Sequence, residues 1–203
     1  MNRSEGEEKA WKVLIESDPD EICQRAGVSY DKKTGLYNLT CLGQVFNVSP
    51  LEKSITALSD GGANFIKKLA YFFNLSVPWY LISAKDIPST GKLIRPEDLP
   101  HGRDIFFKGS HVLPLPALEN RYGSDKNGFI TKCRKLNGTA QAIGDAAFTV
   151  YPMPRIPTTV ILWLGDEEFP PRMDFLFDST AEFHSPLDIL WSIAMMTTLA
   201  FLY

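Results

Sequence analysis

The sequence is poor in cysteine and has none of the spacings by which cysteine binds metal. Only Cys23, Cys41 and Cys133 occur in 203 residues, and no C-x-x-C pair is present. This excludes zinc-ribbon, thioredoxin-like and iron–sulfur signatures within the chain. We therefore expect no iron–sulfur cluster in this chain. An odd number of cysteines, behind a polar and acidic N-terminal segment, favours a reducing, cytoplasmic location.

Signatures of the common enzyme classes are also absent. The Gly-Lys pair at residues 91–92 is followed by Leu93, and no glycine stands five residues before Gly91, so no phosphate-binding P-loop is present. There is no G-x-G-x-x-G, G-x-S-x-G or H-E-x-x-H pattern either. The sequence defines no reaction and leaves open whether the protein is an enzyme.

An excess of positive charge and a membrane-length apolar run are lacking too. The formal net charge is −3 and no Lys/Arg stripe occurs, which argues against a nucleic-acid partner. Residues 189–203 carry no charge, but a membrane span needs about 20 apolar residues, and no basic residue flanks this run. We interpret it as a helix in the core, with a membrane or partner-docking helix as the alternative, and expect no membrane partner.

Length and composition fit one globular domain spanning residues 1–203. The hydrophobic fraction of 44% suffices for a chain of this size to bury roughly 70% of its unfolded surface. Residues 86–102, rich in Pro and Gly, are the only candidate boundary, and they are more typical of a lid or surface loop.

Hydrophobic periodicity predicts an α+β fold in which a mainly antiparallel sheet packs against several helices. Helices are expected over residues 5–16, 19–26, 64–73, 115–122, 124–136 and 187–203, with a separate helical turn starting at Pro78. Strands are expected between residues 28 and 48 and over 146–151, 158–164 and 173–178, with residues 152–157 as a rigid connection.

Three local signals refine this outline. Asp18 is expected to cap a helix that Gly27 ends. Ser185 and Asp188 are expected to form a capping box at the start of the apolar C-terminal helix. In the strand over residues 173–178, the odd-numbered residues are expected to point inward and Asp174 and Asp178 outward.

One region concentrates side chains that can bind a cation. Asp166 and Glu168 lie in the G-D-E-E-F-P-P turn, and Asp178 and His184 lie at the far end of the next strand. Carboxylates with one imidazole suit Mg²⁺, Mn²⁺ or Fe²⁺. These four residues are thus the candidate ligands of a divalent-metal site. The alternative is a solvated turn that acts only as a fold determinant.

Arg155 stands between two prolines and is the candidate anion-binding residue. Its guanidinium can bind a substrate carboxylate or phosphate, and it can equally form a structural salt bridge with the acidic turn. The sequence leaves both roles open.

Several of these stretches resemble one family. PMPRIP (152–157), LWLGDEEFPP (162–171) and FLFD (175–178), with residues 18–31 and 80–94, resemble the bacterial and archaeal DUF3786 family, a domain of unknown function. The resemblance implies an anaerobic prokaryotic setting, in which members of the family largely occur. Some members resemble fusions with an N-terminal four-iron, four-sulfur domain of the kind seen in corrinoid one-carbon metabolism, which implies a link to such proteins. It assigns no catalytic residue.

Two functional hypotheses follow. The first is a binding or accessory module for a redox or corrinoid/iron–sulfur partner, using an exposed apolar or Pro-rich surface around residues 87–100. The second is a divalent-metal-binding protein or metal-dependent enzyme that uses the acidic turn.

Overall fold

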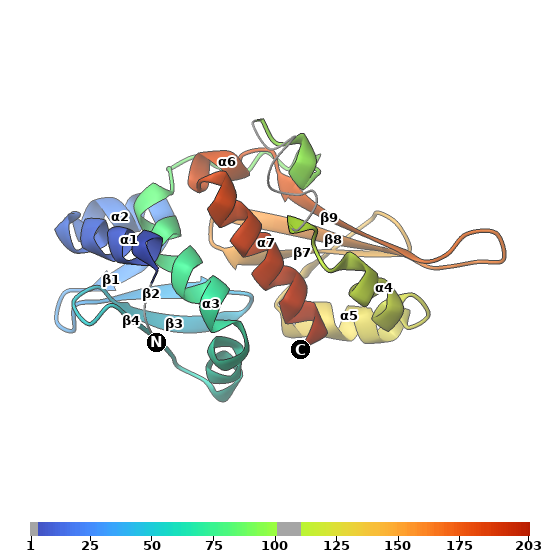
Figure 1. Cartoon of the computed structure of the whole chain (residues 1–203), viewed down its shortest axis with the longest axis horizontal. Coiled ribbons are helices and arrows are strands. Elements are labelled where there is room, and N and C mark those ends of the chain that lie inside the picture. Colours follow the sequence, from blue (N-terminus) through green and yellow to red (C-terminus); the bar gives the residue numbers. More distant parts are fainter. Residues whose placement is uncertain (1–3, 101–110) are drawn as a thin grey trace.

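The computed structural model describes residues 4–100 and 111–203, and in them it has seven α-helices and two antiparallel sheets (Figure 1). The first sheet is a meander in the order β1-β2-β3-β4. The second has five strands in the order β5-β9-β8-β7-β6. The α+β prediction is confirmed.

The N-terminal part follows its local signals closely. Helix α1 spans Glu5–Glu16 and α2 spans Pro19–Ala26. Asp18 Oδ1 accepts the N–H groups of Asp20 and Glu21, and Gly27 ends α2 with φ 66°, as expected. The sheet strands β1 (Ser29–Asp31), β2 (Leu36–Cys41), β3 (Gln44–Ser49) and β4 (Ser54–Ala57) follow.

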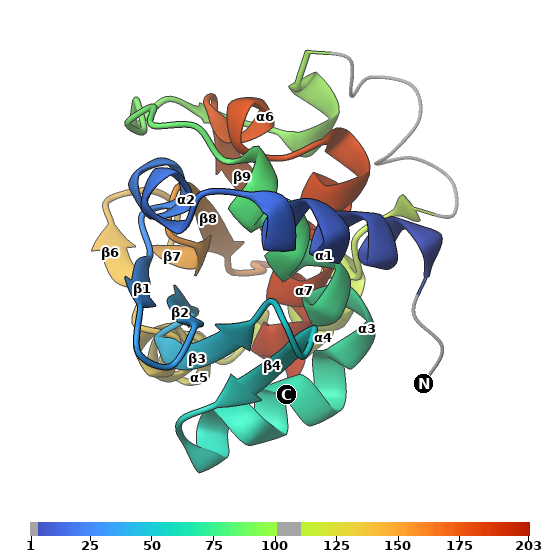
Figure 2. The same cartoon turned by 90° about the vertical axis from the view of Figure 1, so that its left-hand side faces the viewer.

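Helix α3 spans Asp60–Ser83, so the expectation of a separate helical turn starting at Pro78 is wrong. The helix runs through this proline and instead kinks at Leu69, where φ is −120° and ψ is 15°. An interior proline costs about 3 kcal/mol. The packing of α3 against α1 and α7 offsets that cost, and Figure 2 shows α1 lying across α3. A hydrogen bond connects the two helices: Trp79 Nε1 in α3 donates to the Gly6 carbonyl in α1 at 3.0 Å.

The second sheet begins at β5 (Leu93–Ile94), which is followed by a short 3₁₀ helix, η1 (Pro96–Asp98). Its other strands are β6 (Thr139–Gln141), β7 (Ala146–Met153), β8 (Ile156–Trp163) and β9 (Arg172–Asp178). Residues 152–157 are not a rigid connection. Because Met153 pairs with Ile156, Pro154 and Arg155 form a tight hairpin turn.

The remaining helices cover the second sheet. They are α4 (Leu115–Tyr122), α5 (Lys126–Lys135), α6 (Ala181–His184) and α7 (Leu187–Leu202). Asp125 caps α5 by accepting the Gly128 N–H at 2.8 Å. The expected capping box at the start of α7 is absent. No side chain caps α7, because Asp188 bonds only the adjacent Ile189 N–H and Ser185 Oγ has no partner among the described residues.

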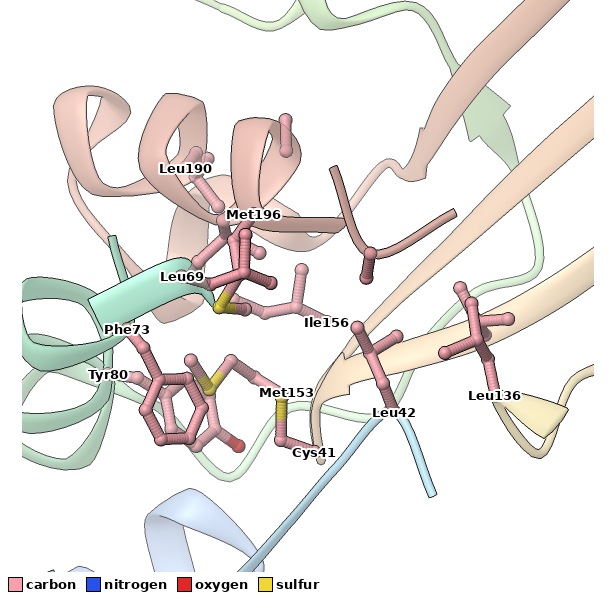
Figure 3. Packing of buried hydrophobic residues seen from close by; sticks show 14 of the residues in the cluster. Cys41, Leu42, Leu69, Phe73, Tyr80, Leu136, Met153, Ile156, Leu190 and Met196 are labelled. Carbon is pink, nitrogen blue, oxygen red and sulfur yellow. The ribbon is translucent and has the colours of Figure 1, made fainter. Parts of the chain in front are cut away.

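Side chains from both sheets share one hydrophobic cluster (Figure 3). Cys41 at the end of β2 and Leu42 in the turn that follows it lie beside Met153 and Ile156 from the second sheet, and Met196 brings α7 into the same cluster. The backbone joins there as well, since the Leu42 N–H donates to the Tyr151 carbonyl at 2.8 Å. Helix α7 is thus a core helix. Across the described residues, no helix is both long and apolar enough for a membrane span.

Candidate functional site

Asp178 ends β9 and is held by a dense set of hydrogen bonds. Its carboxylate accepts the backbone N–H groups of Thr90, Gly91 and Thr180, at 3.2, 2.6 and 3.0 Å. The hydroxyl of Thr180 adds a bond of 2.7 Å. Asp178 is only 2% exposed, so the expected outward orientation is wrong: the segment around Thr90 covers it.

These bonds decide the charge of Asp178. Burial alone would raise the pKa of this carboxyl group. The donors of Thr180, Thr90 and Gly91 stabilise the carboxylate more strongly, and the net pKa is lowered. Asp178 is therefore a carboxylate whose oxygens are already used to fix residues 90–91 to the end of β9.

His184 lies close to Asp178 and is fully buried. Burial lowers its pKa, the positive charge of Arg155 lowers it further, and the carboxylate of Asp178 acts in the opposite direction. The ring is thus neutral. Its Nδ1 accepts the Lys85 N–H at 3.4 Å, which places the ring proton on Nε2. Nε2 has no partner among the described residues.

Asp166 and Glu168 lie in the exposed turn between β8 and β9. Asp166 Oδ1 accepts the N–H groups of Glu168 and Phe169, at 2.9 and 2.7 Å, and the Asp166 N–H donates to the Phe169 carbonyl. The bonds from Phe169 and Glu168 lower the pKa of the Asp166 carboxyl group. Asp166 thus organises the backbone of its own turn.

The structure does not bring the four predicted metal ligands together. The turn and α6 lie at opposite ends of β9. In Figure 1 the turn is at the right-hand tip of the molecule, and α6 is at the upper centre. Seven extended residues separate the two ends by about 20 Å. No group of three or more His, Cys, Asp or Glu side chains that could hold an ion occurs in residues 4–100 and 111–203. The metal site stays a prediction without geometric support.

Arg155 uses its guanidinium inside the protein. Nε donates to the Arg25 carbonyl at 2.8 Å, and Nη2 donates to the Gln24 carbonyl at 2.9 Å and to Asp86 Oδ1 at 2.5 Å. These contacts join the β7–β8 turn to the end of α2 and to the segment after α3. The salt bridge that the sequence left open is present, but it is made with Asp86 and not with the acidic turn.

A groove on the second sheet is the more promising site, and the sequence only partly anticipated it. It has a volume of about 520 Å³, within the range of ligand pockets. One wall is β9, and the others are residues 95–97, residues 112–113 and the first turns of α4. The apolar lining residues are Pro96, Val112, Leu113, Leu115, Pro116, Phe175 and Leu176. The charged ones are Arg95, Glu97, Glu119, Arg172 and Asp174.

The floor of this groove is an unpaired stretch of strand edge. Strand β5 pairs with β9 only at Phe177 and Asp178 and stops at Ile94. Continuing the ladder would place Pro96 opposite Phe175, and proline has no N–H to donate. The edge of β9 therefore loses its partner at Phe175.

Glu119 closes the other end of this edge. Its Oε1 accepts the Met173 N–H at 3.1 Å. Because alternate residues of a strand present N–H and C=O to the same side, Phe175 faces the same edge as Met173. In the part of the chain that the structure describes, the Phe175 N–H and C=O on this edge have no hydrogen-bond partner.

One rim of the groove is a cluster of mutually bonded charged and aromatic side chains. The Arg172 guanidinium pairs with Asp174 Oδ2 at 3.1 Å and lies 5.0 Å from the centre of the Trp163 ring. Trp163 Nε1 donates to the same Asp174 oxygen at 2.8 Å. This cluster fixes Asp174 on the outer face of β9, where the alternation of the strand predicted it.

The sequence predicted an exposed surface around residues 87–100 but did not indicate that β9 forms its other wall. Pro96, placed directly after a short extended stretch, was the available signal for an interrupted strand pairing. The partner strand lies about 80 residues further along the chain, and no local pattern indicates that pairing.

The architecture and this groove define an α+β protein with two antiparallel sheets and an open strand edge on the second. A family model described as a domain of unknown function (DUF3786) matches residues 18–200, and the chain belongs to that family. No curated protein and no solved structure matches the chain.

Proposed function

We propose that the protein is a binding module that takes an extended peptide segment of a partner protein into the β9 groove. The unpaired N–H and C=O of Phe175 carry this proposal. An extended backbone supplies one acceptor and one donor at the spacing that a strand edge requires, which is the basis of recognition by strand addition.

The groove indicates how such a peptide would be held. Two backbone hydrogen bonds contribute only about 1 kcal/mol each. Most of the affinity must come from side chains resting on the apolar lining, between Pro96 on one side and Leu115 and Pro116 on the other. A short edge and a groove of this size support a weak, transient complex.

The family resemblance suggests the class of partner. We propose a redox protein, either a four-iron, four-sulfur protein or a corrinoid protein of anaerobic one-carbon metabolism. Cluster chemistry would belong to the partner, because the three cysteines of this chain are separate and two of them are buried. On this account the module contributes binding and no turnover.

The test uses a displayed library of random linear peptides, followed by purified ferredoxin-type and corrinoid proteins. Val112→Arg places a charge on the groove wall at a side chain that is 55% exposed, so the fold should tolerate it. Leu58→Arg is the matched control at 60% exposure outside the groove.

We expect selected peptides to bind the wild-type protein and Leu58→Arg, and to lose binding in Val112→Arg. Selection of no peptide, or equal binding by both variants, would overturn the groove as the site. Peptide binding without binding of either redox protein would overturn only the class of partner.

A further inference from the structure

A second cavity lies away from the β9 groove, where α3, the end of α5 and the end of α7 meet. Its volume is about 140 Å³. Among the described residues, three ammonium groups and two side-chain amides line it, and no carboxylate side chain does. These polar lining residues are Lys68, Lys132, Lys135, Gln44 and Asn64, together with the phenol of Tyr203.

The three ammonium groups have no ion-pair partner in the described residues. Lys68 Nζ lies 4.8 Å from the centre of the Tyr203 ring, and neither Lys132 nor Lys135 forms a salt bridge. In contrast, Lys32 and Lys53 pair with Asp20 and Glu8. Most other described lysines form no salt bridge either, so the distinguishing feature of this cavity is that three unpaired lysines line it together, in a chain with a net charge of −3.

Lys132 is affected both by its own burial and by the charges around it. It is half-buried, and burial lowers its pKa. The charges of Arg121, Lys135 and Lys68 lower it further, and no carboxylate of the described residues raises it. Arg121 itself is held beside the cavity, because its Nη1 donates to the Leu202 carbonyl at 2.7 Å.

The negative C-terminal ends of nearby helices offset only part of the positive charge at this cavity. Lys132 and Lys135 lie in the last turn of α5, and Tyr203 follows α7, so carbonyl ends of two helices are nearby. Each helix C-terminus carries roughly half a negative charge. Two such termini offset about one of the four cations (Lys68, Lys132, Lys135 and Arg121), and about two remain even when the α-carboxylate of Tyr203 is counted as a further negative charge.

The neutral groups of the cavity add hydrogen-bond donors. Gln44 Oε1 accepts the Ser59 hydroxyl at 2.6 Å, which leaves the Gln44 amide N–H groups to donate. Asn64 lines the same cavity from α3. We propose that this cavity binds a small, multiply charged oxyanion of the phosphate class, held by Lys68, Lys132 and Lys135 with the Gln44 amide. Its size fits such a group rather than the track of a nucleic-acid strand.

Calorimetric titration with inorganic pyrophosphate tests the site. Lys132→Gln and Lys135→Gln each remove one charge-assisted hydrogen bond, and we expect each to weaken binding by about tenfold. Lys12→Gln removes an exposed charge on α1, away from the cavity, and should leave binding unchanged. Absence of binding, or equal weakening in all three variants, would overturn the proposal.

A second measurement separates an anion site from a purely structural role. Without pyrophosphate, Lys132→Gln should melt at a higher temperature than the wild type, because it relieves repulsion among Lys68, Arg121 and Lys135. If these lysines only compensate helix termini, the same change should lower the melting temperature, and that result would overturn the proposal. This site is independent of the peptide groove, and Val112→Arg should bind pyrophosphate as the wild type does.

Discussion

The Glu119 carboxylate accepts the Met173 N–H at 3.1 Å and so occupies the edge of β9 next to Phe175. A side chain here replaces the neighbouring strand that the ladder lacks. Unpaired strand edges invite pairing with other chains, and charged side chains placed on them limit it. Glu119 thereby restricts the open edge to a short stretch.

Glu119→Ala should lengthen the open edge by freeing the Met173 N–H. We expect peptides selected on the groove to bind more tightly, and the variant to self-associate at high concentration, as sedimentation measures. Stability should fall by about 1 kcal/mol, the contribution of one hydrogen bond. Weaker peptide binding by this variant would indicate that Glu119 contacts the ligand directly and would contradict its role at the strand edge.

Asp178→Asn should destabilise the fold without any change at the groove. The asparagine NH₂ group would face the N–H donors of Thr90, Gly91 or Thr180, and we expect a loss of about 2 kcal/mol or more. In a chain of this length, that loss lowers the melting temperature by roughly 4–8 °C.

Asp174→Asn is the control for Asp178→Asn. Because Asp174 is less buried, its substitution should lower the free energy of unfolding by less. A melting shift produced by Mn²⁺ in the wild type and lost in Asp178→Asn would instead support the divalent-metal site.

His184 should make stability depend on pH. Its pKa in the folded protein is lowered from the ordinary value of 6.5. As the pH falls below 6.5, the unfolded chain therefore binds a proton at this histidine more readily than the folded chain does. The contribution of neutral His184 to the free energy of unfolding is therefore fully present above pH 6.5, and it decreases as the pH drops below that value.

Urea unfolding should show a loss of up to about 1 kcal/mol between pH 7.5 and pH 5.5, since one pKa unit corresponds to 1.36 kcal/mol. The loss should be absent in His184→Gln. An unchanged pH profile in that variant would show that another group titrates in this window.

Arg155→Lys should lower stability because a single ammonium group cannot replace three bonds. The guanidinium bonds the carbonyls of Arg25 and Gln24 and the carboxylate of Asp86. We expect a loss of roughly 1–3 kcal/mol in denaturant unfolding, and a negligible loss for the exposed Arg95→Lys. Pyrophosphate binding should be the same in both. Loss of pyrophosphate binding in Arg155→Lys alone would restore its predicted role as an anion site.

The features that could be predicted from the sequence are those set by interactions between residues close together in the chain. The Asp18 cap and Gly27 stop of α2 depend on neighbours within a few residues, and so does the alternation of Met173, Phe175 and Phe177. The burial of Asp178 could not be predicted, because its donors in Thr90 and Gly91 lie almost 90 residues away. The open edge at Phe175 depends on the same long-range pairing of β5 with β9.

Amide hydrogen exchange at Phe175 tests the peptide-groove account most directly. Exchange is measured with and without a selected peptide, in the wild type and in Val112→Arg. The account predicts that the peptide slows exchange of the Phe175 amide in the wild type, while the already bonded Met173 amide changes less, and that Val112→Arg shows no effect. A peptide that binds and leaves the Phe175 amide exchanging at its free rate would contradict recognition by strand addition at β9.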